Sequence, residues 1–271
     1  MRTRFLMLVI IGMALSSLGF DGNTIESVWE AVRFSFTHGK RIDPIETLAK
    51  HEEWKGLSRC GIISNLVESA IYFEEVGIHN TAKSALNLLR FQSCKESADR
   101  LYFYVADRTN VMNRASWIAV SFSMMGPEFA PEIEARCKKR EWELSERRAV
   151  YDIARQMLQS NGASSRIVKR TPEERSQMAK ALLSILPYEE NDQAFLELDW
   201  VLINHSPGWA FSASHFGLLE QRASAYQGKD QNPYVRTIST LKRRMDAGDT
   251  NIVFSADLPV WEPKPELRIR Q

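Results

Sequence analysis

Histidines are the first side chains to consider for chemistry, because imidazole is a common general base and the commonest metal ligand. The chain has five: His38, His51, His79, His205 and His215. Glu75 and His79 are four residues apart, so on a helix they would share one face and could supply two metal ligands. A catalytic zinc site usually has three protein ligands, and no His-Glu-x-x-His spacing occurs. The sequence therefore predicts no metal site and no cofactor.

Ser239 and Lys242 form a Ser-x-x-Lys spacing, which would place a lysine amine one helical turn from a hydroxyl. Serine hydrolases of the penicillin-binding type use this spacing together with companion motifs. Those companions, Ser-x-Asn and Lys-Thr-Gly, are absent from the sequence, as is a Gly-x-Ser-x-Gly elbow. The spacing is therefore attributed to chance, and no catalytic residue is predicted.

The segment NHSPGWAFSASHFG, residues 204–217, carries several side chains that could line a site. It is expected to join two helices, and its candidate binding residues are His205, Trp209, His215 and Phe216. A buried connector and a pocket for a ligand or partner both fit this composition. A hydrolase site between His205 and Gly217 would need one of the histidines beside a carboxylate from a distant helix.

The three cysteines are Cys60, Cys94 and Cys137. Cys60 precedes Gly77 by the same sequence separation by which Cys94 follows it, and Gly77 stands at the expected turn of a helical hairpin. Packed helices can bring such positions within disulfide distance, so a Cys60–Cys94 disulfide is the favoured pairing. A bridge that uses Cys137, or three reduced cysteines, remain alternatives.

The start of the chain, residues 1–19, has the features of a signal peptide. Arg2 and Arg4 precede an apolar run, and Ser17-Leu18-Gly19 offers small residues for cleavage. The run from Phe5 to Phe20 is shorter than the roughly 20 residues that span a bilayer, although an uncleaved anchor is the alternative. We therefore expect an exported protein, periplasmic or secreted, without stable membrane insertion after cleavage.

Composition and charge are ordinary for a globular protein. The 271 residues are 44% hydrophobic and 25% charged, with a formal net charge of +1. Loss of Arg2 and Arg4 with the signal peptide would leave a charge of −1. A near-neutral chain gives no support to nucleic-acid binding, which requires an excess of clustered Lys and Arg. The basic clusters are interleaved with glutamates and are expected to form surface ion pairs.

Apolar residues recur with a helical period along most of the chain, and strand-like alternation is scarce. Examples of such faces are Ile63, Leu66, Val67, Ala70 and Ile71, and Ala149, Ile153, Ala154 and Met157. Capping patterns such as Thr171-Pro172-Glu173-Glu174 mark helix starts. The sequence therefore predicts an all-α protein of antiparallel helical hairpins.

The segment RLYFYVADRTNVMNRASWIAVSFSMMG, residues 100–126, resembles a HEAT-type helical repeat. An apolar helix ends at Asp107, a short turn follows, and Arg114 begins a second helix that ends at Gly126. The resemblance covers about residues 58–160 and departs from the family pattern at Trp117, where a small residue is usual. It implies an α-solenoid, while an irregular multi-helix bundle remains the alternative.

Four regions are expected: the signal peptide 1–19, a repeat-like helical region 20–160, a second helical region 161–250 and an extended arm 251–271. The division follows the polar segment QSNGASSRIVKR, residues 159–170. The arm has three prolines but is too apolar for a free tail, so it is expected to pack on the helices or to insert into a partner.

The predicted function is that of an exported, non-catalytic protein-protein interaction module, either a periplasmic adaptor or an immunity-type inhibitor of a toxic enzyme. Stacked helices build broad surfaces, and no catalytic constellation stands in the sequence. The alternative is the hydrolase near His205–Gly217, and a purely structural envelope protein is a third option. The expected partner is another protein.

Overall fold

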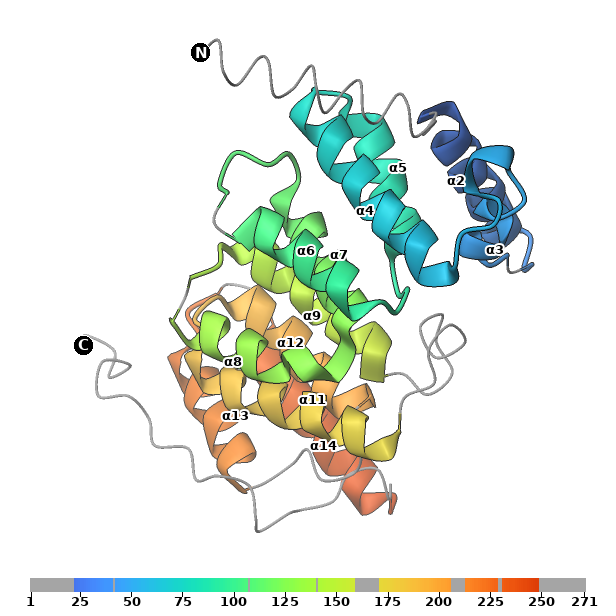
Figure 1. Ribbon diagram of the computed structural model, residues 1–271. Coiled ribbons are helices and arrows are strands. Elements are labelled where there is room, and N and C mark those ends of the chain that lie inside the picture. The colour runs from blue at the N-terminus through green and yellow to red at the C-terminus, as the bar shows by residue number, and fades with distance from the viewer. Residues whose placement is uncertain are drawn as a thin grey trace. The chain divides into compact units, whose positions relative to one another are not determined.

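The computed structural model is all-α, and its description covers residues 22–40, 42–106, 108–139, 141–158, 171–205, 213–228 and 231–248. Within these ranges the chain forms α-helices and short 3-10 helices and no strand (Figure 1). The helical period of the apolar residues therefore predicted the fold class correctly. Among the described helices, none combines the length and the apolar character that a membrane crossing needs.

The chain divides into two compact units, Met1–Met125 and Gly126–Gln271. The sequence placed this division near residue 160. It falls earlier because the helices of residues 130–158 pack against helices that follow residue 171, and so belong to the second unit.

The helices of the first unit are α2 (Gly22–Thr37), α3 (Pro44–Leu48), α4 (Arg59–Glu75), α5 (His79–Leu89), α6 (Lys95–Ala106) and α7 (Arg114–Met125). Glu52–Trp54 form a 3-10 turn between α3 and α4. Local chemistry fixes several boundaries. Ser58 caps α4 by accepting a hydrogen bond from the amide of Gly61, and Gly77 makes the turn into α5 with φ +81°.

Two hairpins, α4/α5 and α6/α7, stack so that α4 lies beside α6 and α5 beside α7 (Figure 1). Contacts between α4 and the α6 segment keep a nearly constant sequence offset. Ser64 forms a hydrogen bond with Ser97, 33 residues later in the sequence. The ion pairs Glu68–Arg100 and Glu75–Arg108 join residues that are 32 and 33 positions apart. A constant positive offset means that the two helices run in the same direction.

The helices of the second unit are α8 (Ala130–Lys139), α9 (Leu144–Leu158), α11 (Pro172–Ile185), α12 (Asp192–His205), α13 (Ala213–Ala225) and α14 (Pro233–Asp246). Two 3-10 turns, Gly126–Phe129 and Leu186–Tyr188, precede α8 and follow α11. At α11 the complete capping box forms, because Thr171 accepts from the Glu174 amide and the Glu174 carboxylate accepts from the Thr171 amide.

In this unit α9 packs against α12, α11 against α8 and α13 against α14, and hydrogen bonds near both ends of α14 link it to α12. Tyr234 at the start of α14 donates to Asp192 at the start of α12, while Arg244 near the end of α14 donates to the carbonyl of Ile203. These pairs are 42 and 41 residues apart, so α12 and α14 are also parallel.

The core explains the unusual tryptophan of the repeat-like segment. Trp117 in α7 is 1% exposed, and its ring centroid lies 5.2 Å from that of Tyr104 in α6. The large indole therefore fills the interior of the α6/α7 hairpin, where it contributes apolar burial that a small residue could not supply.

Candidate functional site

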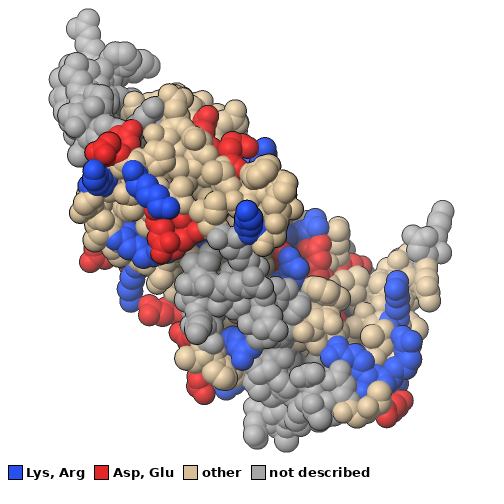
Figure 2. Space-filling view, turned by 90° about the vertical axis from the view of Figure 1, so that its right-hand side faces the viewer, with Lys and Arg blue, Asp and Glu red and all other residues tan. Residues whose placement is uncertain are grey.

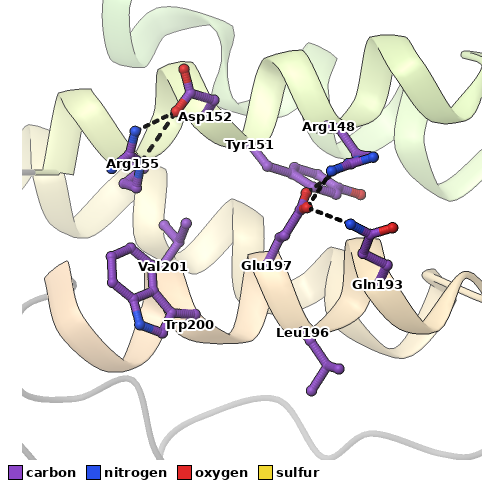
Figure 3. A pocket seen from close by; sticks show the side chains of 9 residues that line it. All are labelled: Arg148, Tyr151, Asp152, Arg155, Gln193, Leu196, Glu197, Trp200 and Val201. Atoms are coloured by element: carbon purple, nitrogen blue, oxygen red, sulfur yellow. Dashed lines mark hydrogen bonds and ion pairs between the residues drawn. The ribbon is translucent and has the colours of Figure 1, made fainter. Parts of the chain in front are cut away.

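A surface groove runs between α9 and α12 and encloses about 430 Å³. Its lining residues are Arg148, Tyr151, Asp152, Arg155, Gln193, Leu196, Glu197, Trp200 and Val201. Figure 3 shows the two helices side by side, with Arg148 opposite Gln193 and Glu197, and Arg155 toward the end that holds Trp200. The volume is in the range of small-ligand and side-chain pockets.

Two ion pairs neutralise the charges of the groove. Arg148 on α9 binds Glu197 on α12 through two nitrogens, with an Nε–Oε2 distance of 2.8 Å (Figure 3). Arg155 binds Asp152 one helical turn away on α9. The four charges sum to zero, and each is already engaged. A charged ligand would have to compete with these pairs, so the groove suits an uncharged occupant.

Trp200 is an exposed aromatic side chain that lines the groove. It lies on α12 and is 50% exposed, although tryptophan side chains are usually highly buried. Together with Leu196 it gives the groove an apolar surface between its ion pairs. Trp, Tyr and Arg are the side chains that contribute most to protein interfaces, and all three line this groove.

A buried polar network supports one wall of the groove from below. Glu189 is 2% exposed and accepts two hydrogen bonds from Arg147, at 2.9 and 3.0 Å, and one from the Tyr151 hydroxyl at 2.8 Å. Burial alone would raise the pKa of this carboxyl. The hydrogen bonds from Arg147, Tyr151 and the Asn191 amide outweigh burial and hold the pKa of Glu189 below its usual value.

The same network encloses Cys137 and fixes Tyr151. Burial, assisted by the nearby Cys137 and Glu189, raises the pKa of the Tyr151 hydroxyl far above its ordinary value. Burial also raises the pKa of the Cys137 thiol to about 12. Both groups are therefore protonated at neutral pH and act as structural hydrogen-bonding groups, not as nucleophiles.

His215 meets a carboxylate, as a hydrolase site would require. Its Nε2 lies 2.6 Å from Oδ1 of Asp199, which α12 presents to α13. Both side chains are 1% exposed. A side chain buried to this degree does not reach a ligand at the protein surface, and the pair joins the two helices internally.

The other predicted site residues are placed separately. His205 is the last residue of α12, and Phe216 lies half-buried in α13, which begins at Ala213. Trp209 lies outside the described residues. Ser239 and Lys242 are both exposed on α14.

Glu75 and His79 do not bind each other. His79 Nδ1 lies 2.9 Å from the Glu74 carboxylate, and Glu75 instead binds Arg108 at 3.0 Å. Within the described ranges, no group of three or more His, Cys, Asp or Glu side chains is placed to hold a metal ion.

Several exposed apolar side chains, here called the tip surface, lie at the turns of the two hairpins in the first unit or within one helical turn of them. They are Val76, Ile78, Phe103 and Met112, which are 40%, 49%, 71% and 56% exposed. The buried Glu74 carboxylate joins the two turns, because it accepts a hydrogen bond of 2.6 Å from the Met112 amide and also binds His79. These contacts hold the turn that carries Ile78 next to the turn that carries Met112.

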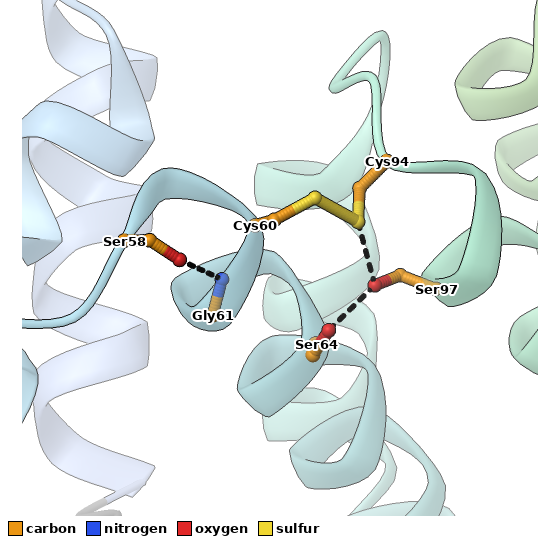
Figure 4. The surroundings of a disulfide bond; sticks show 6 residues. All are labelled: Ser58, Cys60, Gly61, Ser64, Cys94 and Ser97. Atoms are coloured by element: carbon orange, nitrogen blue, oxygen red, sulfur yellow. Dashed lines mark hydrogen bonds between the residues drawn. A yellow bond between two sulfur atoms is a disulfide. The ribbon is translucent and has the colours of Figure 1, made fainter.

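The disulfide joins successive hairpins and does not close one hairpin across its foot. Cys60 lies in the first turn of α4, and Cys94 precedes α6, with a Cα–Cα distance of 5.8 Å. Ser97 Oγ lies 3.2 Å from the Cys94 sulfur and 2.8 Å from Ser64 Oγ (Figure 4). The bond therefore fixes the first residues of α4 against those of α6. The remaining cysteine, Cys137, is free and buried.

Charged side chains of both signs are interspersed on the face drawn in Figure 2. Ion pairs within and between helices account for several of the basic clusters in the sequence. Arg136 binds Glu132 and Glu141, and Lys138 binds Glu134.

Comparisons with known proteins assign no family. No protein-family model matches the chain, and neither the curated proteins nor the solved structures contain a match to it.

Sequence reasoning missed the groove between α9 and α12. Its residues come from two segments that are far apart in sequence. The sequence pattern of an Arg or Glu on a helix surface is the same whether the side chain faces solvent or a second helix. One feature of the sequence could have indicated the groove. Trp200 is a large apolar residue that does not lie on the apolar helix face formed by Leu198, Val201 and Leu202.

Proposed function

We propose that this chain is an exported, non-catalytic protein-binding module, with a role as a periplasmic adaptor or as an inhibitor of another protein. The observation that carries the proposal is the tip surface. Ile78, Phe103 and Met112 expose about half or more of their surface. Ile78 and Met112 lie at turns that Glu74 joins by hydrogen bonds, and Phe103 lies in the last turn of α6. A backbone held in this way loses little entropy on binding, which favours association with a second protein.

The stacking of hairpins supports the repeat interpretation within this proposal. The offset of 32–34 residues between α4 and the α6 segment corresponds to one helix-pair repeat. Repeat proteins of this kind present loops and helix faces in rows, and they commonly use such rows as binding surfaces. A HEAT-like solenoid is the arrangement that we propose for these two stacked hairpins, residues 59–125.

Export is supported by the cysteines. A disulfide between Cys60 and Cys94 persists in an oxidising compartment, such as a bacterial periplasm or the extracellular space. The expected signal segment, residues 1–19, lies outside the described residues. We therefore keep export as part of the proposal.

Site-specific photocrosslinking tests this function. A photoreactive amino acid replaces Met112 in the tip surface, and the variant is irradiated in its native envelope or medium. Phe34 is the matched control, because it is 64% exposed and lies in α2, which begins beside the turn of the α4/α5 hairpin and ends away from it. The proposal expects one defined protein to be captured from Met112 and not from Phe34. Equal capture from both positions, or capture from neither, would overturn it.

A hydrolase remains a second candidate because of one contact, the 2.6 Å contact between His215 and Asp199. A histidine oriented by a carboxylate supplies two members of a Ser-His-Asp triad. The candidate requires a nucleophile that reaches His215, whose side chain is 1% exposed. Panels of ester, amide and glycoside substrates test it, with His215→Gln as the control that must abolish any activity found.

A further inference from the structure

The groove between α9 and α12 has properties that specify its occupant. Its accessible surface combines Trp200 and Leu196 with two ion pairs of zero net charge. An occupant that matches it is a polypeptide segment with apolar side chains and few charges. The α12 helix has 14 residues and is therefore about 21 Å long, so the groove can take an extended segment of several residues.

The chain leaves its last described helix near one end of this groove. Arg244 in the last turn of α14 donates a hydrogen bond to the carbonyl of Ile203 at 3.3 Å. Ile203 lies three residues beyond Trp200, so it is less than one helical turn from the indole-bearing position. The residues that follow Gly248 therefore start from the same end of α12 that carries Trp200.

The segment that follows has the composition that the groove requires. Residues 251–261 read NIVFSADLPVW and contain one charged side chain, Asp257. Their apolar side chains are Ile252, Val253, Phe254, Leu258, Val260 and Trp261. A segment of this length can extend over at most roughly 40 Å, which exceeds the length of α12. These residues lie outside the described ranges.

We propose that residues 251–261 bind in the groove between α9 and α12, with Trp200 as the main contact. Intramolecular binding benefits from a high effective concentration, because the covalent connection at Gly248 holds the segment near the groove. This groove belongs to the second unit, whereas the tip surface belongs to the first.

Hydrogen–deuterium exchange on the purified chain tests the proposal. The amides of residues 251–261 should exchange about tenfold more slowly in the wild type than in Trp200→Ala. Val235→Ala is the matched control, because Val235 is also 50% exposed but lies on α14 outside the groove. That control should retain the protection of the wild type. Unprotected amides in the wild type, or protection that Trp200→Ala leaves unchanged, would overturn the proposal.

A reciprocal change in the segment itself leaves the helices untouched. Phe254→Asp should abolish the protection and increase the exchange of residues 193–201, while Phe254→Leu should preserve both. A photoreactive residue at Leu196 should then form an intrachain crosslink to residues 251–261. A crosslink to a second copy or to a different protein would contradict the proposal, and neither result depends on whether the tip surface binds a partner.

Discussion

The imidazole Nε2 of His215 lies 2.6 Å from Oδ1 of Asp199, and each side chain is 1% exposed. This contact joins α12 to α13 inside the second unit. Burial of both groups gives the pair a structural role, because removal of one partner leaves the other polar group buried without compensation.

Asp199→Ala is therefore expected to lower the free energy of unfolding by about 3–5 kcal/mol, the usual cost of breaking a buried pair. Glu197→Ala is the control on the same helix. The side chains of this pair, Arg148 and Glu197, are 40% and 38% exposed, so solvent screens the pair and its loss should cost less than about 1 kcal/mol. Urea unfolding of the three proteins measures both values. Equal, small losses would show that the His215–Asp199 contact does not support the fold.

The Glu189 network predicts the acid limit of stability. The pKa of Glu189 is lower in the folded chain than in the unfolded chain. Its contribution is therefore complete above the unfolded value of about 4.3 and is lost as the pH falls through the folded value. Unfolding free energies measured from about pH 5 to about pH 3 should fall less steeply in Glu189→Gln than in the wild type. Trp200→Ala, which removes no titrating group, should keep the wild-type slope, and a Glu189→Gln slope equal to it would refute the prediction.

Thiol counting tests the cysteine arrangement directly. The chain has three cysteines, of which Cys60 and Cys94 are joined and Cys137 is buried with a pKa raised to about 12. The native chain should react with no equivalent of a thiol reagent at pH 8, the unfolded chain with one, and the reduced unfolded chain with three. Rapid reaction of the native chain would show that Cys137 is accessible.

Removal of the disulfide should weaken the stacking of the two hairpins. The bond closes a loop with a sequence separation of 34 residues, so the Cys60→Ser, Cys94→Ser double variant should lose about 3–4 kcal/mol of unfolding free energy. Denaturant unfolding of the variant and of the reduced wild type measures this loss, and the two should agree. A reduced wild type as stable as the oxidised protein would contradict the prediction.

Local patterns predicted much of the fold. The helical period of Ile63, Leu66 and Val67 identified the apolar face of α4, and the Thr171 capping box placed the start of α11. These features depend on neighbouring residues, so the sequence displays them directly. The Cys60–Cys94 pairing was also favoured, because both cysteines have the same sequence separation from Gly77, and the bond joins the first turn of α4 to the residue before α6.

Long-range pairing limited the prediction of the site. His215 was considered as part of a binding segment, yet α13 begins at Ala213 and buries it against Asp199. The Arg148–Glu197 and Arg147–Glu189 contacts join positions 49 and 42 residues apart. A helical period identifies the apolar face of a helix but not the helix that packs against it. These contacts and the division after residue 125 could therefore be found only from the structure.

The measurement that tests the central claim most directly is a crosslinked affinity purification of the chain from its native envelope or medium. The wild type is compared with a variant that carries Ile78→Asp, Phe103→Asp and Met112→Asp, and with Phe34→Asp as the control. The account predicts one stoichiometric protein partner for the wild type and the control, and its loss from the triple variant. Absence of any partner from the wild type, or a partner that the triple variant retains, would contradict a protein-binding role for the tip surface.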